Sequence, residues 1–199
     1  MPTQKLAESR LPTIYGEFQM IAYSSNFEDF PHLALIHGNT KFDHTVPVRV
    51  HSECMTGDVF GSVRCDCGEQ LHGAMVHFSK HGGILIYLRQ EGRGIGLVNK
   101  LKAYNLQDEG MDTIKANYAL GFHADERDYA PAIEMLQSLG IKEISLLTNN
   151  PEKLDAFEGS GITVKERVPI EMNPQKENED YLRTKKEDMG HLLKRVRID

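Results

Sequence analysis

The sequence lacks several features, and each absence argues against a class of protein. No apolar run approaches the roughly 20 residues that a membrane helix needs, so we expect no membrane partner. The segment from Met1 to Leu6 lacks the apolar core of a secretory signal, which favours a cytoplasmic protein. The formal net charge is −6, which argues against a nucleic-acid partner, because such proteins usually carry a basic face. The negative net charge does not exclude a small anionic ligand, because a pocket can be locally basic.

Cysteine is also scarce, and its placement is informative. The three cysteines are Cys54, Cys65 and Cys67, an odd number that makes a poor disulfide framework in the cytosol. Thiolates are soft ligands that favour zinc, and Gly68 frees the backbone beside the Cys-x-Cys pair. Three protein ligands leave one tetrahedral position open, where a catalytic zinc holds the water to be activated. The spacing therefore predicts a catalytic zinc site.

Other interpretations of these residues stay open at this point. The cysteines can be buried without a metal, and His51 or His72 can supply a fourth ligand that closes a structural site. His77 and His81, spaced i and i+4, form a weaker candidate for a second metal pair. Spacing alone does not decide among these possibilities.

The hydrophobic pattern predicts an α/β fold in one domain over residues 1–199, a mixed sheet flanked by helices. Apolar residues make up 40% of the chain, enough for a core. In the β-rich N-terminal third, strand patterns occur at 18–22, 33–36 and 46–50, and Pro47 suggests an edge position or a strand start. Beyond residue 69, helical and strand patterns alternate. These patterns are helices at 69–81, 97–104, 131–139 and from Pro151, and strands at 84–88, 144–147 and 162–164. The charged segment from about residue 172 to 199 is expected to be a mobile, extended tail.

A glycine-rich segment follows the predicted strand that ends at Leu88. Gly92, Gly94 and Gly96 at a strand-to-helix turn would let backbone N–H groups approach an anion. The segment matches neither the P-loop nor the dinucleotide fingerprint, so a tight turn with solvated arginines is an equal alternative. The polar stretch 125–128 likewise has two interpretations. Its acidic residues can mark an ordinary helix start, or they can form a buried Asp–Arg pair in a cleft.

Five motifs together resemble GTP cyclohydrolase II over about residues 10–195. They are RVHSEC at 49–54, GSVRCDCG at 61–68, RQEGRGIGL at 89–97, GFHADERD at 121–128 and LTNNPEK at 147–153. The resemblance implies zinc-dependent hydrolysis of GTP, which opens the imidazole ring, releases formate and removes pyrophosphate. The implied product is 2,5-diamino-6-(5-phosphoribosylamino)pyrimidin-4-one, in the first step of riboflavin biosynthesis. The resemblance also implies that Mg²⁺ binds with the triphosphate and that the protein is a homodimer.

The resemblance further implies a role for each matching residue. Cys54, Cys65 and Cys67 would bind the zinc. Asp125 would accept a proton, Arg127 would be the nucleophile, and Tyr104 would lie near the reacting ring. The GTP site would be lined by Arg49, Val50, His51, Ser52, Glu53, Gln70, Glu91, Gly92, Arg93, Thr113, Thr148 and Lys153.

Three alternatives to this function remain at the level of the sequence. A related enzyme could stop after the first ring hydrolysis and release a formamide. An RNA-binding zinc module is disfavoured by the cysteine spacing and the negative charge. A non-catalytic interaction protein is disfavoured because the polar motifs fall at predicted strand ends, where α/β proteins bind ligands. The length leaves no room for a fused dihydroxybutanone-phosphate synthase domain, so we expect the single-activity form.

Overall fold

The structure, a computed structural model, describes residues 3–24 and 30–196. The chain forms two compact units, each of which is described by itself. The first unit comprises Met1–His51, Leu71–Arg89 and Tyr129–Ile170. The second comprises Ser52–Gln70, Gln90–Asp128 and Glu171–Asp199.

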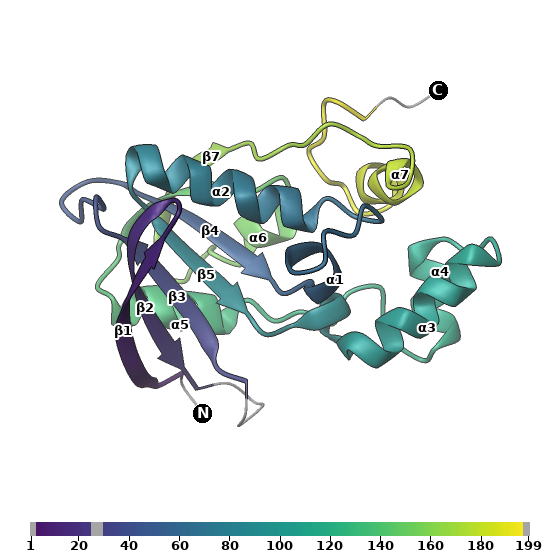
Figure 1. Cartoon of the computed structure of the whole chain (residues 1–199), viewed down its shortest axis with the longest axis horizontal. Coiled ribbons are helices and arrows are strands. Elements are labelled where there is room, and N and C mark those ends of the chain that lie inside the picture. Colours follow the sequence, from purple (N-terminus) through teal and green to yellow (C-terminus); the bar gives the residue numbers. More distant parts are fainter. Residues whose placement is uncertain (1–2, 25–29, 197–199) are drawn as a thin grey trace. The chain divides into compact units, whose positions relative to one another are not determined.

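A seven-stranded mixed sheet forms the first unit within the described residues, in the order β1-β2-β3-β5-β4-β6-β7 (Figure 1). Neighbouring strands from β1 to β3, and the pair β3 and β5, run antiparallel, whereas β4, β6 and β7 are parallel. The strands are β1 (Lys5–Thr13), β2 (Gly16–Tyr23), β3 (His32–His37), β4 (Val46–Ser52), β5 (Ile84–Leu88), β6 (Glu143–Leu147) and β7 (Thr163–Val168).

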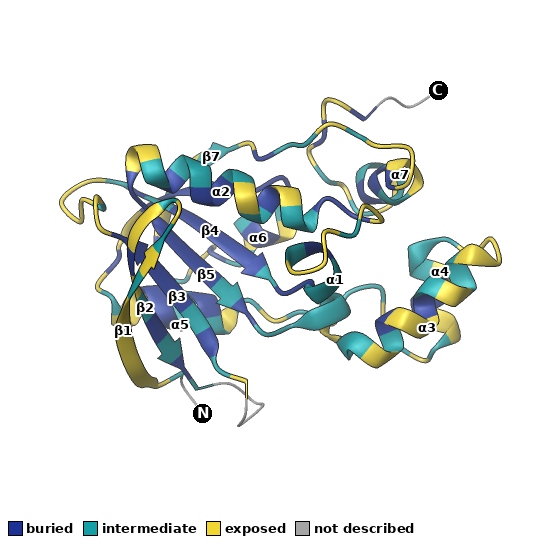
Figure 2. Ribbon diagram, viewed as in Figure 1, coloured by how far each residue is buried: buried dark blue, intermediate teal, exposed yellow. Residues whose placement is uncertain are grey.

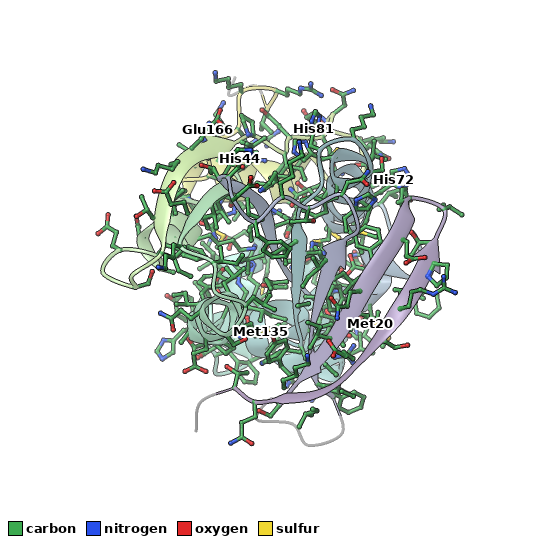
Figure 3. The ribbon with its side chains drawn as sticks, turned by 90° about the vertical axis from the view of Figure 1, so that its left-hand side faces the viewer. Met20, His44, His72, His81, Met135 and Glu166 are labelled. Atoms are coloured by element: carbon green, nitrogen blue, oxygen red, sulfur yellow. The ribbon has the colours of Figure 1, made fainter. Side chains whose placement is uncertain are left out.

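Helices cover both faces of this sheet. They are α2 (Cys67–His81), α5 (Ala130–Ser138) and α6 (Pro151–Asp155). In Figure 1 α2 lies in front of the sheet and α5 behind it, and Figure 3 shows the unit from the side, with Met20 of β2 and Met135 of α5 labelled. Because side chains alternate along a strand, Ile84 and Ile86 of β5 point to one core, which they share with Met135 and Leu136 of α5. Figure 2 shows β5 mostly buried and β1 exposed.

Short helices build the second unit. They are α1 (Met55–Asp58), the 3₁₀ turn η1 (Glu91–Gly94), α3 (Gly96–Asp108), α4 (Thr113–Ala119) and α7 (Glu179–Glu187). A small apolar cluster of Leu182, Leu193 and Val196, with Tyr181 against it, anchors α7. Within the described residues, no helix has both the length and the apolar composition needed to cross a membrane.

The fold class is confirmed: the sheet is mixed, helices flank it, and the N-terminal part is rich in strands. The edge position suggested for Pro47 is wrong, because β4 lies between β5 and β6. Pro47 is instead the second residue of β4, which agrees with the alternative of a strand start. Strand β1 was not predicted beyond short apolar runs, because most of its side chains are exposed.

The expectation of an extended tail is wrong for residues 179–187, which form α7. The helix forms because the chain turns back after it, so that Leu193 and Val196 pack against Leu182. A strongly charged helix such as this one gains most of its stability from such packing. The last three residues of the tail lie outside the described range.

Candidate functional site

Three cysteine sulfurs converge in the second unit around helix α1. Cys54 caps the start of α1, Cys65 lies in the loop after it, and Cys67 begins α2. The Sγ atoms of Cys54 and Cys65 are 3.6 Å apart, and all three sulfurs lie within 4.8 Å of one another. In a tetrahedral zinc site, bonds of about 2.3 Å place two sulfurs about 3.8 Å apart. The donor set therefore fits a soft cation such as zinc.

Two glycines allow this approach. A Cβ on Gly57 would lie only 3.2 Å from the sulfur of Cys65 and 3.3 Å from that of Cys54. A Cβ on Gly68 would collide with the carbonyl oxygen of Gly57. Gly68 is thus required for close packing of α1 against the start of α2, and not for an unusual φ, since its φ is not positive. Nothing in the sequence pattern had singled out Gly57.

The charges around the sulfurs differ from one cysteine to the next. Hydrogen bonds from the Cys65 and Cys67 thiols, with the nearby Lys100, hold the pKa of Cys54 well below its usual range. The hydrogen bond to Cys54 raises the pKa of Cys65 to about 11, and the pKa of Cys67 is also raised, first by its hydrogen bond to Cys54. One thiolate is therefore favoured in the absence of a metal ion, and a bound metal ion is needed to ionise all three thiols.

Lys100 of α3 is the cation of this centre, and sequence reasoning missed it. Its Nζ lies 3.1 Å from the sulfur of Cys54 and 2.8 Å from Oε1 of Glu91. Burial opposes its charge, but the Cys54 thiolate and Glu91 outweigh burial and raise the pKa of Lys100. The other oxygen of Glu91 accepts a hydrogen bond from the backbone N–H of Met55 at 2.6 Å. Glu91 thus connects η1 to α1 and α3.

Tyr104 lies one helical turn beyond Lys100, on the same side of α3. Its hydroxyl is 3.4 Å from Oγ1 of Thr56, which is 3.7 Å from the sulfur of Cys54. Burial raises the pKa of Tyr104, so the side chain stays a neutral phenol. The structure therefore brings Tyr104 to the cysteine centre, where it can donate a hydrogen bond.

The glycine-rich loop has a strained backbone and is more than a tight solvated turn. Gly92 and Arg93 have φ values of 63° and 62°, and Arg93 is the only non-glycine residue with positive φ in the described part of the chain. A Cβ on Gly94 would press against Glu126, whose backbone N–H donates to the carbonyl oxygen of Arg93. The Arg93 guanidinium lies 5.8 Å from the ring centre of Tyr181. Its Nη2 is buried without a hydrogen-bond partner among the described residues, as suits an anion-binding group.

Asp125 and Arg127 form a partly buried ion pair in the second unit. Nε of Arg127 donates to both carboxylate oxygens of Asp125, at 2.8 and 3.0 Å, and Nη2 donates to Oδ2. Burial raises the pKa of Asp125, but the hydrogen bonds and charge of Arg127 outweigh burial and hold it below its usual range. Both groups are therefore charged at neutral pH.

We expect Asp125→Asn to lower the free energy of unfolding by about 2 kcal/mol at pH 7, because it removes the carboxylate that pairs with a partly buried guanidinium. The folded-state pKa of Asp125 is lowered, so this stabilisation is present above the ordinary value of about 3.9 and is lost as the pH falls through the lowered pKa. Urea unfolding of both proteins at several pH values should show a gap that is constant from pH 8 to 5 and shrinks below pH 4. Asp180→Asn, at an exposed pair with Arg183, is the control. A gap that persists unchanged into strong acid would contradict the expectation.

A second group of predicted residues gathers in the first unit, where the parallel strands β4 and β6 end. Nη1 of Arg49 donates to the carbonyl oxygen of Leu147 at 2.9 Å, and Nζ of Lys153 donates to that of Val50 at 2.8 Å. Both cations are at most 5% exposed. The Thr148 hydroxyl accepts a hydrogen bond from the backbone N–H of Asn150 at 3.0 Å. Buried cations at the carboxyl ends of parallel strands are suited to an anionic ligand.

The structure also places the other predicted residues. His51 stacks on Tyr87 in the first unit, with ring centres 5.5 Å apart. Ser52 ends β4, Glu53 follows it, and Thr113 is the first residue of α4. Gln70 donates a hydrogen bond from Nε2 to Asp66.

His72, labelled in Figure 3, has its Nδ1 2.7 Å from the hydroxyl of Tyr15. Among the described residues, no histidine or carboxylate joins the three sulfurs as a possible metal ligand.

The chain matches known proteins over most of its length. The model of a family described as GTP cyclohydrolase II matches residues 4–169. A protein from Chlorobium phaeovibrioides named riboflavin biosynthesis protein RibBA is 52% identical over 96% of this chain and 47% of its own length. A protein of the same name from Bacillus cereus is 53% identical over 94% of this chain and 47% of its own length. The chain thus spans about half the length of the curated relatives it matches.

Among the solved structures that match is one described as RibBX, a two domain 3,4-dihydroxy-2-butanone 4-phosphate synthase from A. baumannii. It superposes with a TM-score of 0.48 at 18% identity, over 87% of this chain and 41% of that one. A likeness this weak carries no argument about function.

Proposed function

We propose, from the premise that this chain belongs to the GTP cyclohydrolase II family, that it hydrolyses GTP at a zinc centre. The reaction opens the imidazole ring, releases formate and pyrophosphate, and yields 2,5-diamino-6-(5-phosphoribosylamino)pyrimidin-4-one for riboflavin biosynthesis. The observation that carries the proposal is the group of three sulfurs with Lys100 and Tyr104 beside it.

Cys54, Cys65 and Cys67 would hold the zinc. When bound, zinc supplies a Lewis acid that activates water at neutral pH. Lys100 offsets part of the negative charge of the thiolates and keeps Glu91 in place. Tyr104, kept neutral by burial, can donate a hydrogen bond to the imidazole nitrogen that gains a proton as the ring opens.

The triphosphate would be bound by cations, with Mg²⁺ as an additional counter-ion. In the second unit, Nη2 of Arg93 is buried and bonds to no other described residue, which suits it to a phosphate. In the first unit, Arg49 and Lys153 are buried where β4 and β6 end. Arg127, held charged by Asp125, would neutralise the α-phosphate from which pyrophosphate leaves.

The other residues that the resemblance assigns to GTP stay in the proposal. They are Val50, His51, Ser52, Glu53, Gln70, Glu91, Gly92, Thr113 and Thr148. The bonds that Gln70 and Glu91 make to Asp66 and Lys100 give both residues a supporting role as well. A homodimer and a cytoplasmic location remain predictions.

Incubation of the protein with GTP, zinc and Mg²⁺ should release one formate and one pyrophosphate per GTP. ATP should be hydrolysed about 10⁴-fold less efficiently, because a site that hydrogen-bonds guanine leaves its buried polar groups unpaired with adenine. Both products are quantified by coupled assays, and the pyrimidine is identified by mass spectrometry.

Three results of this experiment are informative. Comparable turnover of ATP would contradict the specificity. A formamide in place of free formate would show that the enzyme stops after the first hydrolysis. Absence of both released products would refute the proposed function.

A further inference from the structure

Helix α7 lies beyond residues 4–169, which the family model matches, yet it contacts the cysteine centre. Asp66 stands between Cys65 and Cys67 and is 2% exposed. Its Oδ1 accepts a hydrogen bond from Nζ of Lys185, on α7, at 2.6 Å, and its Oδ2 accepts one from Nε2 of Gln70. Both carboxylate oxygens of Asp66, the residue between the two cysteines, therefore accept hydrogen bonds.

Lys185 is buried because it lies on the inward-facing side of α7. It lies one turn after Leu182, so both residues face inward from the same side of the helix. Its Nζ also lies 4.5 Å from the ring centre of Tyr181, the residue that contacts Arg93 of the glycine-rich loop. The helix therefore connects the Cys-x-Cys turn with a proposed phosphate-binding residue, all within the second unit.

A buried ion pair is a poor means of gaining stability, because removing two charges from water costs about as much as their attraction returns. What such a pair does supply is a fixed geometry. Here the geometry concerns the backbone that carries two metal ligands, because Asp66 is bonded to Cys65 on one side and Cys67 on the other. Groups that orient metal ligands in this way commonly change metal affinity by about 10–100-fold.

We infer that Lys185 is a positioning residue of the metal centre, which acts through Asp66 to fix the turn that bears Cys65 and Cys67. Helix α7 then contributes to metal binding, because it carries Lys185. The inference rests on the proposed zinc site and adds a residue to it that lies 119 positions from Asp66 in the sequence.

The experiment compares Lys185→Met, Asp66→Asn, the double variant Asp66→Asn/Lys185→Met, and Lys185→Arg in the full chain. Arg183→Met, which removes a half-exposed cation from the same helix, is the matched control. Zinc affinity is measured by competition with a chelator, the Co²⁺ form is measured by its thiolate charge-transfer absorption, and stability is measured by thermal unfolding.

Lys185→Met should weaken zinc binding by about 10–100-fold and alter the Co²⁺ spectrum, whereas Arg183→Met should change neither. Lys185→Arg keeps the cation and should restore part of the affinity. The double variant is the decisive one, because it leaves no buried charge unpaired. It should regain most of the stability that Lys185→Met loses and yet still bind zinc weakly.

Two outcomes would overturn the inference alone: unchanged zinc affinity and Co²⁺ spectrum in Lys185→Met, or full recovery of affinity together with stability in the double variant. If Lys185→Met does not fold, the double variant and Lys185→Arg decide the matter by the same readouts. Failure of the wild-type chain to bind zinc would instead overturn the proposed zinc site itself, together with this inference.

Discussion

Replacement of Cys65 or Cys67 with serine is expected to remove the zinc and to reduce formate release from GTP by about three orders of magnitude or more. Serine is not ionised at neutral pH and is a poor ligand for a soft cation, so two sulfur ligands cannot hold the ion. The loss is large because bound zinc lowers the pKa of its water to about 7. Zinc content is measured by elemental analysis, and formate by a coupled assay.

Val63→Ser is the matched control for this experiment. Val63 lies in the same loop as Cys65 and is 43% exposed, so the change introduces the same hydroxyl without removing a sulfur. This variant should keep its zinc and its activity. Retention of one zinc per chain in a Cys65→Ser/Cys67→Ser double variant would show that the metal is held elsewhere.

Arg127→Ala should reduce pyrophosphate release by about 10³-fold, the order of effect seen when an arginine that neutralises a reacting phosphate is removed. Two alternative roles of Arg127 would each account for this loss. The resemblance proposes that Arg127 attacks the α-phosphorus, whereas the ion pair with Asp125 favours a guanidinium that stays charged and only neutralises the phosphate. An arginine has a pKa above about 12, and an ionised neighbour strengthens its hold on the proton.

The two roles can be separated experimentally. Arg127→Lys keeps a cation, so a charge-neutralising role predicts partial activity without any covalent adduct. A covalent role instead predicts a phosphoramidate adduct, visible by mass spectrometry when Cys65→Ser blocks ring opening. Arg10→Ala, at an exposed pair with Glu17, controls for the loss of an arginine. Full activity in Arg127→Ala would rule out both roles.

The parts of this molecule that could be predicted are those whose signal is local. The strand Ile84–Leu88 and the helices beside it follow from hydrophobic period, and the cysteines meet because only ten residues separate Cys54 from Cys65. Lys100 and Lys185 could not be predicted, because their partners Cys54 and Asp66 lie 46 and 119 residues away. A lysine in a polar helix usually faces water, and only the tertiary packing shows that these two do not. Helix α7 could not be predicted for the same reason. Its apolar residue Leu182 packs against Leu193 and Val196, which lie in a charged segment without a clear hydrophobic pattern.

The backbone at Arg93 has a consequence for attempts to engineer the protein. A side chain in the left-handed region costs about 1 kcal/mol or more relative to glycine, and the preceding residue, Gly92, adopts the same conformation without that strain. A directed-evolution campaign that selects only for heat tolerance would therefore favour glycine at position 93. The same exchange would remove the guanidinium that contacts Tyr181 and is proposed to bind phosphate. Heat tolerance and turnover thus select different residues at position 93, and a screen for thermostable variants should score activity in the same round.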